Sequence, residues 1–133
     1  MKLIKILSIV GIIAGLTACN TGSTSSTGSV SIVLNPNQLV IGPTQSKATT
    51  ATYSASSGSS AIGQTLYITP LSGYTITNTC GSTAISTTSA SCSITVMCTQ
   101  SSGTCPSGTI YICPSNQTSS CSSYTRLTIV GIV

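Results

Sequence analysis

The residue types that carry most enzyme chemistry are missing from this chain of 133 residues. It contains four basic residues and no Asp, Glu or His. It therefore has no carboxylate pair for glycoside hydrolysis, no Ser-His-Asp triad and no oxygen cage for a hard metal ion. Lys47 follows Ser46, but Thr44 stands where the nucleophile of a Ser-x-x-Lys motif belongs. We predict that the protein is not an enzyme and uses no metal or cofactor, with Lys47 as an exposed strand residue.

Cysteine is the remaining reactive type, and Cys19 stands apart from the other six. It ends a leader in which Lys2 and Lys5 are basic and residues 6–16 are apolar, a run too short to span a bilayer as a helix. The Leu-Thr-Ala-Cys sequence that ends at Cys19 resembles the lipobox of bacterial lipoproteins. This resemblance implies a diacylglyceryl group on the Cys19 thiol, cleavage before Cys19 and acylation of the new amino terminus, for example by palmitate. The alternative is an ordinary secretory or membrane-anchoring leader with an incidental cysteine.

The leader sets the expected organisation of the chain. Residues 1–18 are the predicted lipoprotein signal peptide, and residues 19–29 are the lipidated cysteine with a Gly/Ser/Thr-rich tether. Residues 30–133 then form a single domain. Asn20 follows the cysteine, where many lipoproteins kept at the inner membrane have Asp. By this resemblance we expect a lipid-anchored protein of the bacterial cell envelope, at the outer membrane if the source has two membranes.

With Cys19 lipidated, six cysteines remain. Six in an exported chain suggest three disulfide bonds formed in an oxidising compartment. No C-x-x-C spacing occurs among them and the chain has no His, which disfavours zinc and thioredoxin-type sites. Six cysteines allow fifteen pairings, so connectivity stays open. We favour the sequential set, which joins Cys80 with Cys92, Cys98 with Cys105, and Cys113 with Cys121.

The strands that must position these cysteines follow from hydrophobic alternation. Residues 92–98 show it most clearly, with the even-numbered positions on one face and the odd-numbered positions on the other. Further strands are expected over residues 30–34 and 38–41, split near Pro36, and over 47–54, 61–69, 73–77, 108–113 and 124–133. No segment after the leader has a helical period. Short strands separated by turn residues predict an all-β, antiparallel sandwich of about seven or eight strands, stapled by disulfides.

Four segments carry a family resemblance. Residues 79–82, 90–96, 107–112 and 127–131 read TCGS, ASCSITV, SGTIYI and LTIVG. Together they resemble a bacterial immunoglobulin-like domain of the abnormal-spindle/Hydin type. The resemblance implies an immunoglobulin-like β-sandwich in which the first two cysteines of the six pair across a corner. The four cysteines from Cys98 onward depart from the family's usual pattern.

Charge limits the partners. Lys2 and Lys5 leave with the leader, so the mature domain keeps Lys47 and Arg126, too few for nucleic-acid binding. Two functions remain: a membrane-anchored, non-catalytic structural or protein-interaction module, or an adhesin-like surface domain that binds a glycan or another ligand. The tyrosines are Tyr53, Tyr67, Tyr74, Tyr111 and Tyr124. A tyrosine cluster on one exposed face would favour the glycan, and an open edge strand with scattered tyrosines would favour a protein partner.

Overall fold

The structure is a computed structural model and describes residues 28–133, so Cys19, the predicted leader and most of the predicted tether lie outside the described residues. The strands are β1 (Val30–Asn35), β2 (Gln38–Ile41), β3 (Ser46–Ala55), β4 (Leu66–Ile68), β5 (Tyr74–Asn78), β6 (Ala90–Cys98), β7 (Gly108–Pro114) and β8 (Thr125–Gly131). Two short 3-10 turns, η2 (Cys80–Ser82) and η3 (Thr118–Ser123), accompany them.

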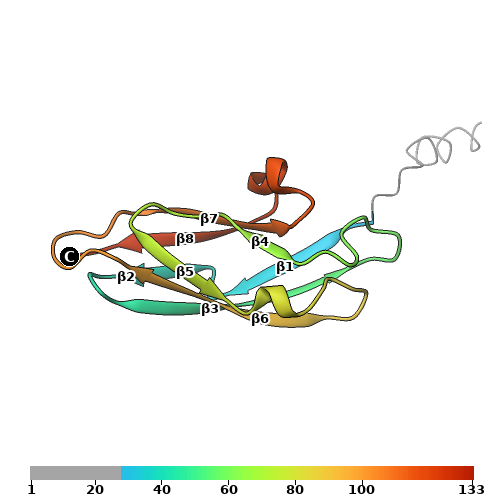
Figure 1. The fold of residues 1–133 in the computed structure, drawn as a ribbon, viewed down its shortest axis with the longest axis horizontal. Coiled ribbons are helices and arrows are strands. Elements are labelled where there is room, and N and C mark those ends of the chain that lie inside the picture. The colour runs from blue at the N-terminus through green and yellow to red at the C-terminus, as the bar shows by residue number, and fades with distance from the viewer. Residues whose placement is uncertain (1–27) are drawn as a thin grey trace, which may run out of the picture.

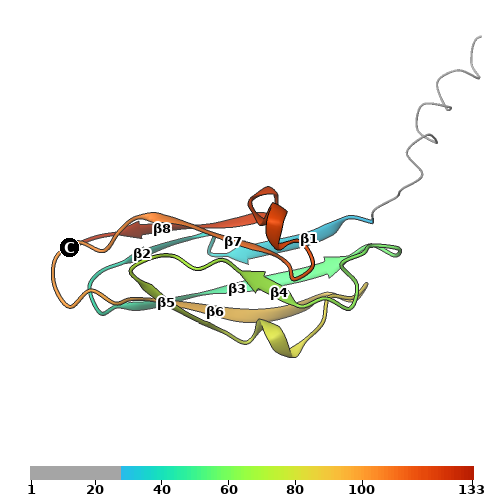
Figure 2. The same cartoon turned by 45° about the horizontal axis from the view of Figure 1, so that its top comes forward.

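The described strands form two four-stranded sheets. One has the order β1-β3-β6-β5 and the other the order β2-β8-β7-β4. Figures 1 and 2 show the two sheets as stacked layers, with β1 beginning at the end of the sandwich opposite the C-terminus. The predicted all-β sandwich of seven or eight strands is confirmed.

The first strand is split between the sheets at the predicted proline. β1 pairs antiparallel with β3, whereas β2 pairs parallel with β8. Proline cannot donate a ladder hydrogen bond, and Pro36 lies where the chain leaves one sheet for the other. The chain continues in the same direction through this crossing, so β2 runs alongside β8 and not against it. The other described strand pairs are antiparallel, as predicted, and β2 with β8 is the one parallel pair among the described strands.

The core forms between the inner faces of the sheets. On β6 the even-numbered residues 92–98 are buried, and the odd-numbered ones are exposed or partly exposed, as predicted. The largest fully buried aliphatic side chains are Ile41, Ile85, Ile94, Ile110, Ile112, Leu127 and Ile129. Tyr53 is the one aromatic side chain among the described residues that is fully buried with them. The interior is therefore aliphatic, as the absence of Phe and Trp from the sequence requires.

The strand expected over residues 61–69 was wrong in its first half. Only Leu66–Ile68 forms a strand, and it pairs with β7. Gly63 has φ of 84°, a left-handed conformation that ends extended structure. The Ile62 N–H also donates to the Ser59 carbonyl, a turn hydrogen bond. Residues 59–64 therefore turn, and Ile62 is 40% exposed.

Candidate functional site

The six cysteines predicted to pair form three disulfide bonds, and the pairs are the sequential ones that the sequence favoured. They are Cys80–Cys92, Cys98–Cys105 and Cys113–Cys121. The first ties η2 to β6, and the second ties the end of β6 to the loop that leads to β7. The third fastens η3 to the outer side of β7 (Figures 1 and 2). The bridges thus tie loops and 3-10 turns to the inner strands β6 and β7.

Two of the five tyrosines serve the fold. Tyr53 is buried in the core, and its hydroxyl donates a hydrogen bond of 3.0 Å to the carbonyl of Thr83. The Tyr74 hydroxyl donates a hydrogen bond of 2.7 Å to the carbonyl of Pro106. Burial raises the pKa of the Tyr74 hydroxyl above its ordinary value, because the phenolate form would lose hydration.

The other three tyrosines do not form one platform. Tyr67 is the register partner of Cys113, and Tyr111 lies two residues before Cys113, so Tyr67 and Tyr111 share the outer face of their sheet. Tyr124 lies just beyond η3, where it lines a hollow. Of the two arrangements that the sequence left open, the tyrosines follow the scattered one.

The edge strand β5 is open to a further strand. The Thr99 N–H donates to the Gly73 carbonyl, and the Thr79 N–H donates to the Ser93 carbonyl. Because an antiparallel ladder alternates, the odd-numbered positions of β5 bond to β6 and the even-numbered positions turn their backbone groups outward. Ile76 and Asn78 therefore present N–H and carbonyl groups on the side where the described residues place no other strand. The outward N–H of Tyr74 already donates a hydrogen bond to the Leu71 carbonyl.

The edge strands β1 and β4 are better protected. On β1, the hydroxyl of Thr125 donates to the outward carbonyl of Ile32 at 2.6 Å. β4 has three residues, and Pro70 follows soon after its end. β5 has the sequence YTITN, without the Lys, Pro or bulge that commonly blocks strand addition. β5 is therefore better suited than β1 or β4 to accept a partner strand.

A hollow of about 210 Å³ lies beside the open edge. Its lining comes from the inner side of β5 and from the chain at the end of β4: Ile68, Pro70, Tyr74, Ile76 and Asn78. Every second side chain of an added strand would face this side. The hollow could thus hold one small apolar side chain of a partner.

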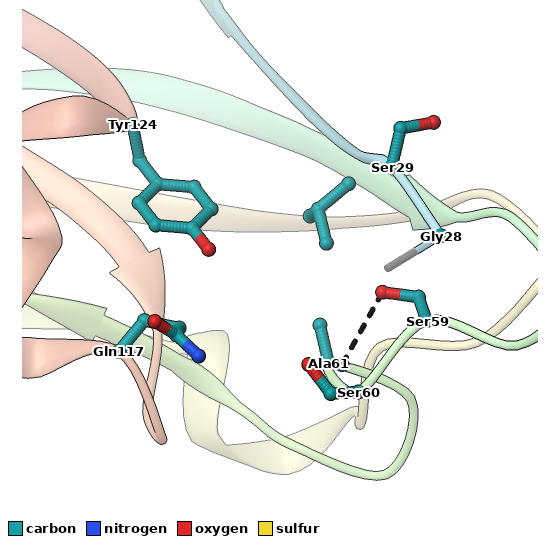
Figure 3. A pocket seen from close by; sticks show the side chains of 8 residues that line it. Gly28, Ser29, Ser59, Ser60, Ala61, Gln117 and Tyr124 are labelled. Carbon is teal, nitrogen blue, oxygen red and sulfur yellow. Dashed lines mark hydrogen bonds between the residues drawn. The ribbon is translucent and has the colours of Figure 1, made fainter. Parts of the chain in front are cut away.

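A second, larger hollow of about 330 Å³ lies near the start of β1 (Figure 3). It is lined by Gly28, Ser29, Val30, Ser59, Ser60, Ala61, Gln117 and Tyr124. None of these side chains is charged. The sequence did not point to this hollow: its lining residues lie in segments that were read as tether, strand start and loop.

Two kinds of site are not found in the described part of the chain. Residues 28–133 contain no group of three side chains of the metal-binding types close enough to hold an ion. The same residues include no helix with the length and apolar character needed to cross a membrane.

Comparison with known proteins identifies the fold alone. No family model matches the chain, and no curated protein matches it. Domains 4 and 5 of the S-layer protein SbsC are similar, with a TM-score of 0.51, 11% identity, and coverage of 77% of this chain and 52% of that one. The structure of the S-layer protein rSbsC(31-844) matches with a TM-score of 0.51 and 12% identity, over 77% of this chain and 13% of that one. The chain thus spans about half of the first structure and a small part of the second.

Proposed function

We propose that this protein is a lipid-anchored module of the bacterial cell envelope that binds another protein and catalyses no reaction. The observation that carries the proposal is the open β5 edge with the hollow beside it, which Ile68, Pro70 and Ile76 help to line. An extended segment of a partner would continue the sheet by backbone hydrogen bonds and place an apolar side chain in the hollow.

The leader supports the location. Its basic start, its short apolar run and the Leu-Thr-Ala-Cys sequence at Cys19 resemble a lipoprotein signal peptide. Three disulfide bonds suit an oxidising compartment outside the cytoplasm. With an anchor of this kind, the domain needs little net charge to stay dispersed. We place the protein at the outer membrane if the source has two membranes.

The fold and composition support the non-catalytic role. The chain has no Asp, Glu or His to act as acid, base or metal ligand. The similar solved structures are domains of an S-layer protein, which fits a role at the cell surface. The segments that resemble an immunoglobulin-like domain of the abnormal-spindle/Hydin type fit the same interpretation, since such domains are found on exported proteins.

Site-specific photocrosslinking in a bacterial host tests the proposal. A photoreactive phenylalanine analogue replaces Thr77, which is exposed on β5, or Thr52, which is exposed on the central strand β3. We expect a discrete protein adduct from position 77 in the membrane fraction and none from position 52. Equal adducts at both positions, or none at position 77, would remove β5 as the binding edge.

A further inference from the structure

We propose that the hollow shown in Figure 3 binds one ring of a neutral saccharide. The lining of this hollow includes no residue of β5. The inference therefore goes beyond the proposed protein-binding role and is tested separately from it. Its basis is the way in which distant segments of the chain form a fixed, uncharged and hydrogen-bonding wall.

Hydrogen bonds hold the walls of the hollow in place. The Ser56 N–H donates to the carbonyl of Ser29 at 2.9 Å, which joins the start of β1 to the turn that carries Ser59 and Ser60. Across the hollow, the side-chain amide of Asn116 donates to the carbonyl of Ser60 at 3.0 Å. A hollow fixed in this way exists before a ligand arrives, as is usual for small-molecule sites.

The positions of Gln117 and Tyr124 are fixed by η3. Gln117 directly precedes this turn and Tyr124 directly follows it, while the Cys113–Cys121 bridge fastens the turn to β7. The turn η3 therefore sets the distance between the two side chains. The close approach of the opposite wall needs glycine, since a Cβ on Gly28 would lie 2.6 Å from the backbone nitrogen of Ser59.

The polar groups in the hollow suit a ligand that both donates and accepts hydrogen bonds. Figure 3 shows the Tyr124 hydroxyl and the Gln117 side-chain amide pointing into the hollow from one side and Ser60 lying on the other. The Gln117 Oε1 already accepts a hydrogen bond of 3.1 Å from Ser120, which leaves the amide nitrogen as a donor toward the hollow. Sugar hydroxyls match these groups, and the C–H face of a pyranose packs well against an aromatic ring such as that of Tyr124.

Other ligand classes fit less well. An anion or a cation would find no opposite charge in the lining and would lose hydration on entry. An apolar ligand would leave the Tyr124, Gln117 and Ser60 polar groups without partners. The volume, about 330 Å³, lies near the lower end for small-molecule sites, which run from about 300 to 1,000 Å³. One neutral pyranose ring is therefore the class of ligand that matches both chemistry and size.

NMR titration of the full chain in detergent micelles tests the proposal. The probes are neutral methyl glycosides (glucoside, galactoside, mannoside and N-acetylglucosaminide), with methyl glucuronide as the charged comparison. A synthetic peptide of residues 21–27 tests whether the chain's own Ser/Thr-rich segment fills the hollow instead. We expect at least one neutral glycoside to shift the signals of Ser60, Gln117 and Tyr124, with a Kd of about 1 mM, and the glucuronide and the peptide to leave them unchanged.

Variants locate the binding. Ser60→Tyr fills the hollow from an exposed position, and Tyr124→Ala removes the ring. Tyr67→Ala is the matched control, because Tyr67 lies on the outer face of the edge strand β4 and does not line the hollow. The first two changes should weaken glycoside binding about tenfold or more, and the control should not change it. Because Tyr124 also packs against the core, Ser60→Tyr and Gln117→Ala keep the test valid if Tyr124→Ala does not fold.

The proposal fails on any of three results. The first is that no neutral glycoside binds at concentrations up to about 50 mM. The second is that the Ser60→Tyr variant binds glycoside with native affinity. The third is that the peptide or the glucuronide binds more tightly than every neutral glycoside. None of these results bears on the β5 edge, which the crosslinking experiment tests.

Discussion

Gly131, at the end of β8, lies directly against the main chain of Cys105. A Cβ on Gly131 would be 1.8 Å from the carbonyl oxygen of Cys105. The Gly131 N–H donates to the Ser107 hydroxyl at 3.0 Å, and the Cys105 N–H donates to the carbonyl of Ile132 at 3.2 Å. The last strand is therefore packed against the loop that carries the Cys98–Cys105 bridge, with no space for a side chain between them.

Replacing Gly131 by Ala should be strongly destabilising. The new methyl group can be accommodated only if backbone moves, so we expect the free energy of unfolding to fall by about 2–4 kcal/mol. Gly81→Ala is the control, since a Cβ there meets nothing within 4 Å. Chemical denaturation of both variants checks this. Equal stability of the two variants would contradict the observed contact.

Removing the Cys113–Cys121 bridge should release η3 and leave the sandwich paired. Replacing both cysteines by Ala should lower the free energy of unfolding by about 2.5 kcal/mol on the chain-entropy estimate for this short loop. Amide exchange should become fast at residues 118–123 while the pairs between β3 and β6 stay protected. The control removes Cys80 and Cys92 in the same way and should leave η3 protected. Loss of protection across the whole domain in the first variant would show that the bridge supports more than η3.

Stability should depend little on pH from about 5 to 9, because the chain has no Asp, Glu or His side chain to titrate there. Burial raises the pKa of the folded-state Tyr74 hydroxyl. Below the unfolded-state pKa, about 10, Tyr74 is neutral in both states and its contribution is constant. Above that pH the unfolded state loses the proton first, so the free energy of unfolding falls.

Tyr74→Phe isolates this effect. At neutral pH the variant should lose about 1 kcal/mol, the usual net value of a hydrogen bond such as that from Tyr74 to Pro106. Denaturation at a series of pH values should show the gap between the two proteins narrowing above about pH 10. A gap that stays constant up to about pH 11 would mean that Tyr74 ionises equally easily in both states.

A charge on the open edge should block strand addition. Lysine on a natural edge strand commonly prevents pairing with another strand. Ile76→Lys should therefore reduce crosslinking from position 77 about tenfold. Val33→Lys is the matched control, because Val33 is 59% exposed on the edge strand β1. The control should crosslink as the native protein does. Thermal unfolding of both variants checks that the sandwich is intact, and native crosslinking from a folded Ile76→Lys variant would contradict binding at β5.

Much of the fold follows from local sequence. The alternation of residues 92–98 identifies a half-buried strand, and Pro36 indicates where the first strand breaks. The favoured disulfide pairing joins cysteines that are 12, 7 and 8 residues apart, so each bridge closes a short local loop. These features depend on residues that are close together in the chain, and the structure agrees with them.

The features that sequence did not predict depend on contacts between distant segments. The parallel pairing of β2 with β8 joins residues about ninety positions apart, such as Gln38 and Thr128. Alternation alone suggested that residues 61–69 were one strand, but the left-handed Gly63 interrupts them. The hollow combines residues near 28, 59 and 117, and the serines of its lining resemble those of any Ser-rich loop.

Mass spectrometry of the amino terminus tests whether Cys19 anchors the protein to a membrane. The full chain is expressed in a bacterial host beside a Cys19→Ser variant, and the peptide that carries position 19 is isolated from the membrane fraction. We predict that the native chain begins at Cys19 and carries diacylglyceryl and acyl groups, whereas the variant carries neither. A native chain that begins elsewhere, or that has an unmodified thiol at Cys19, would contradict it.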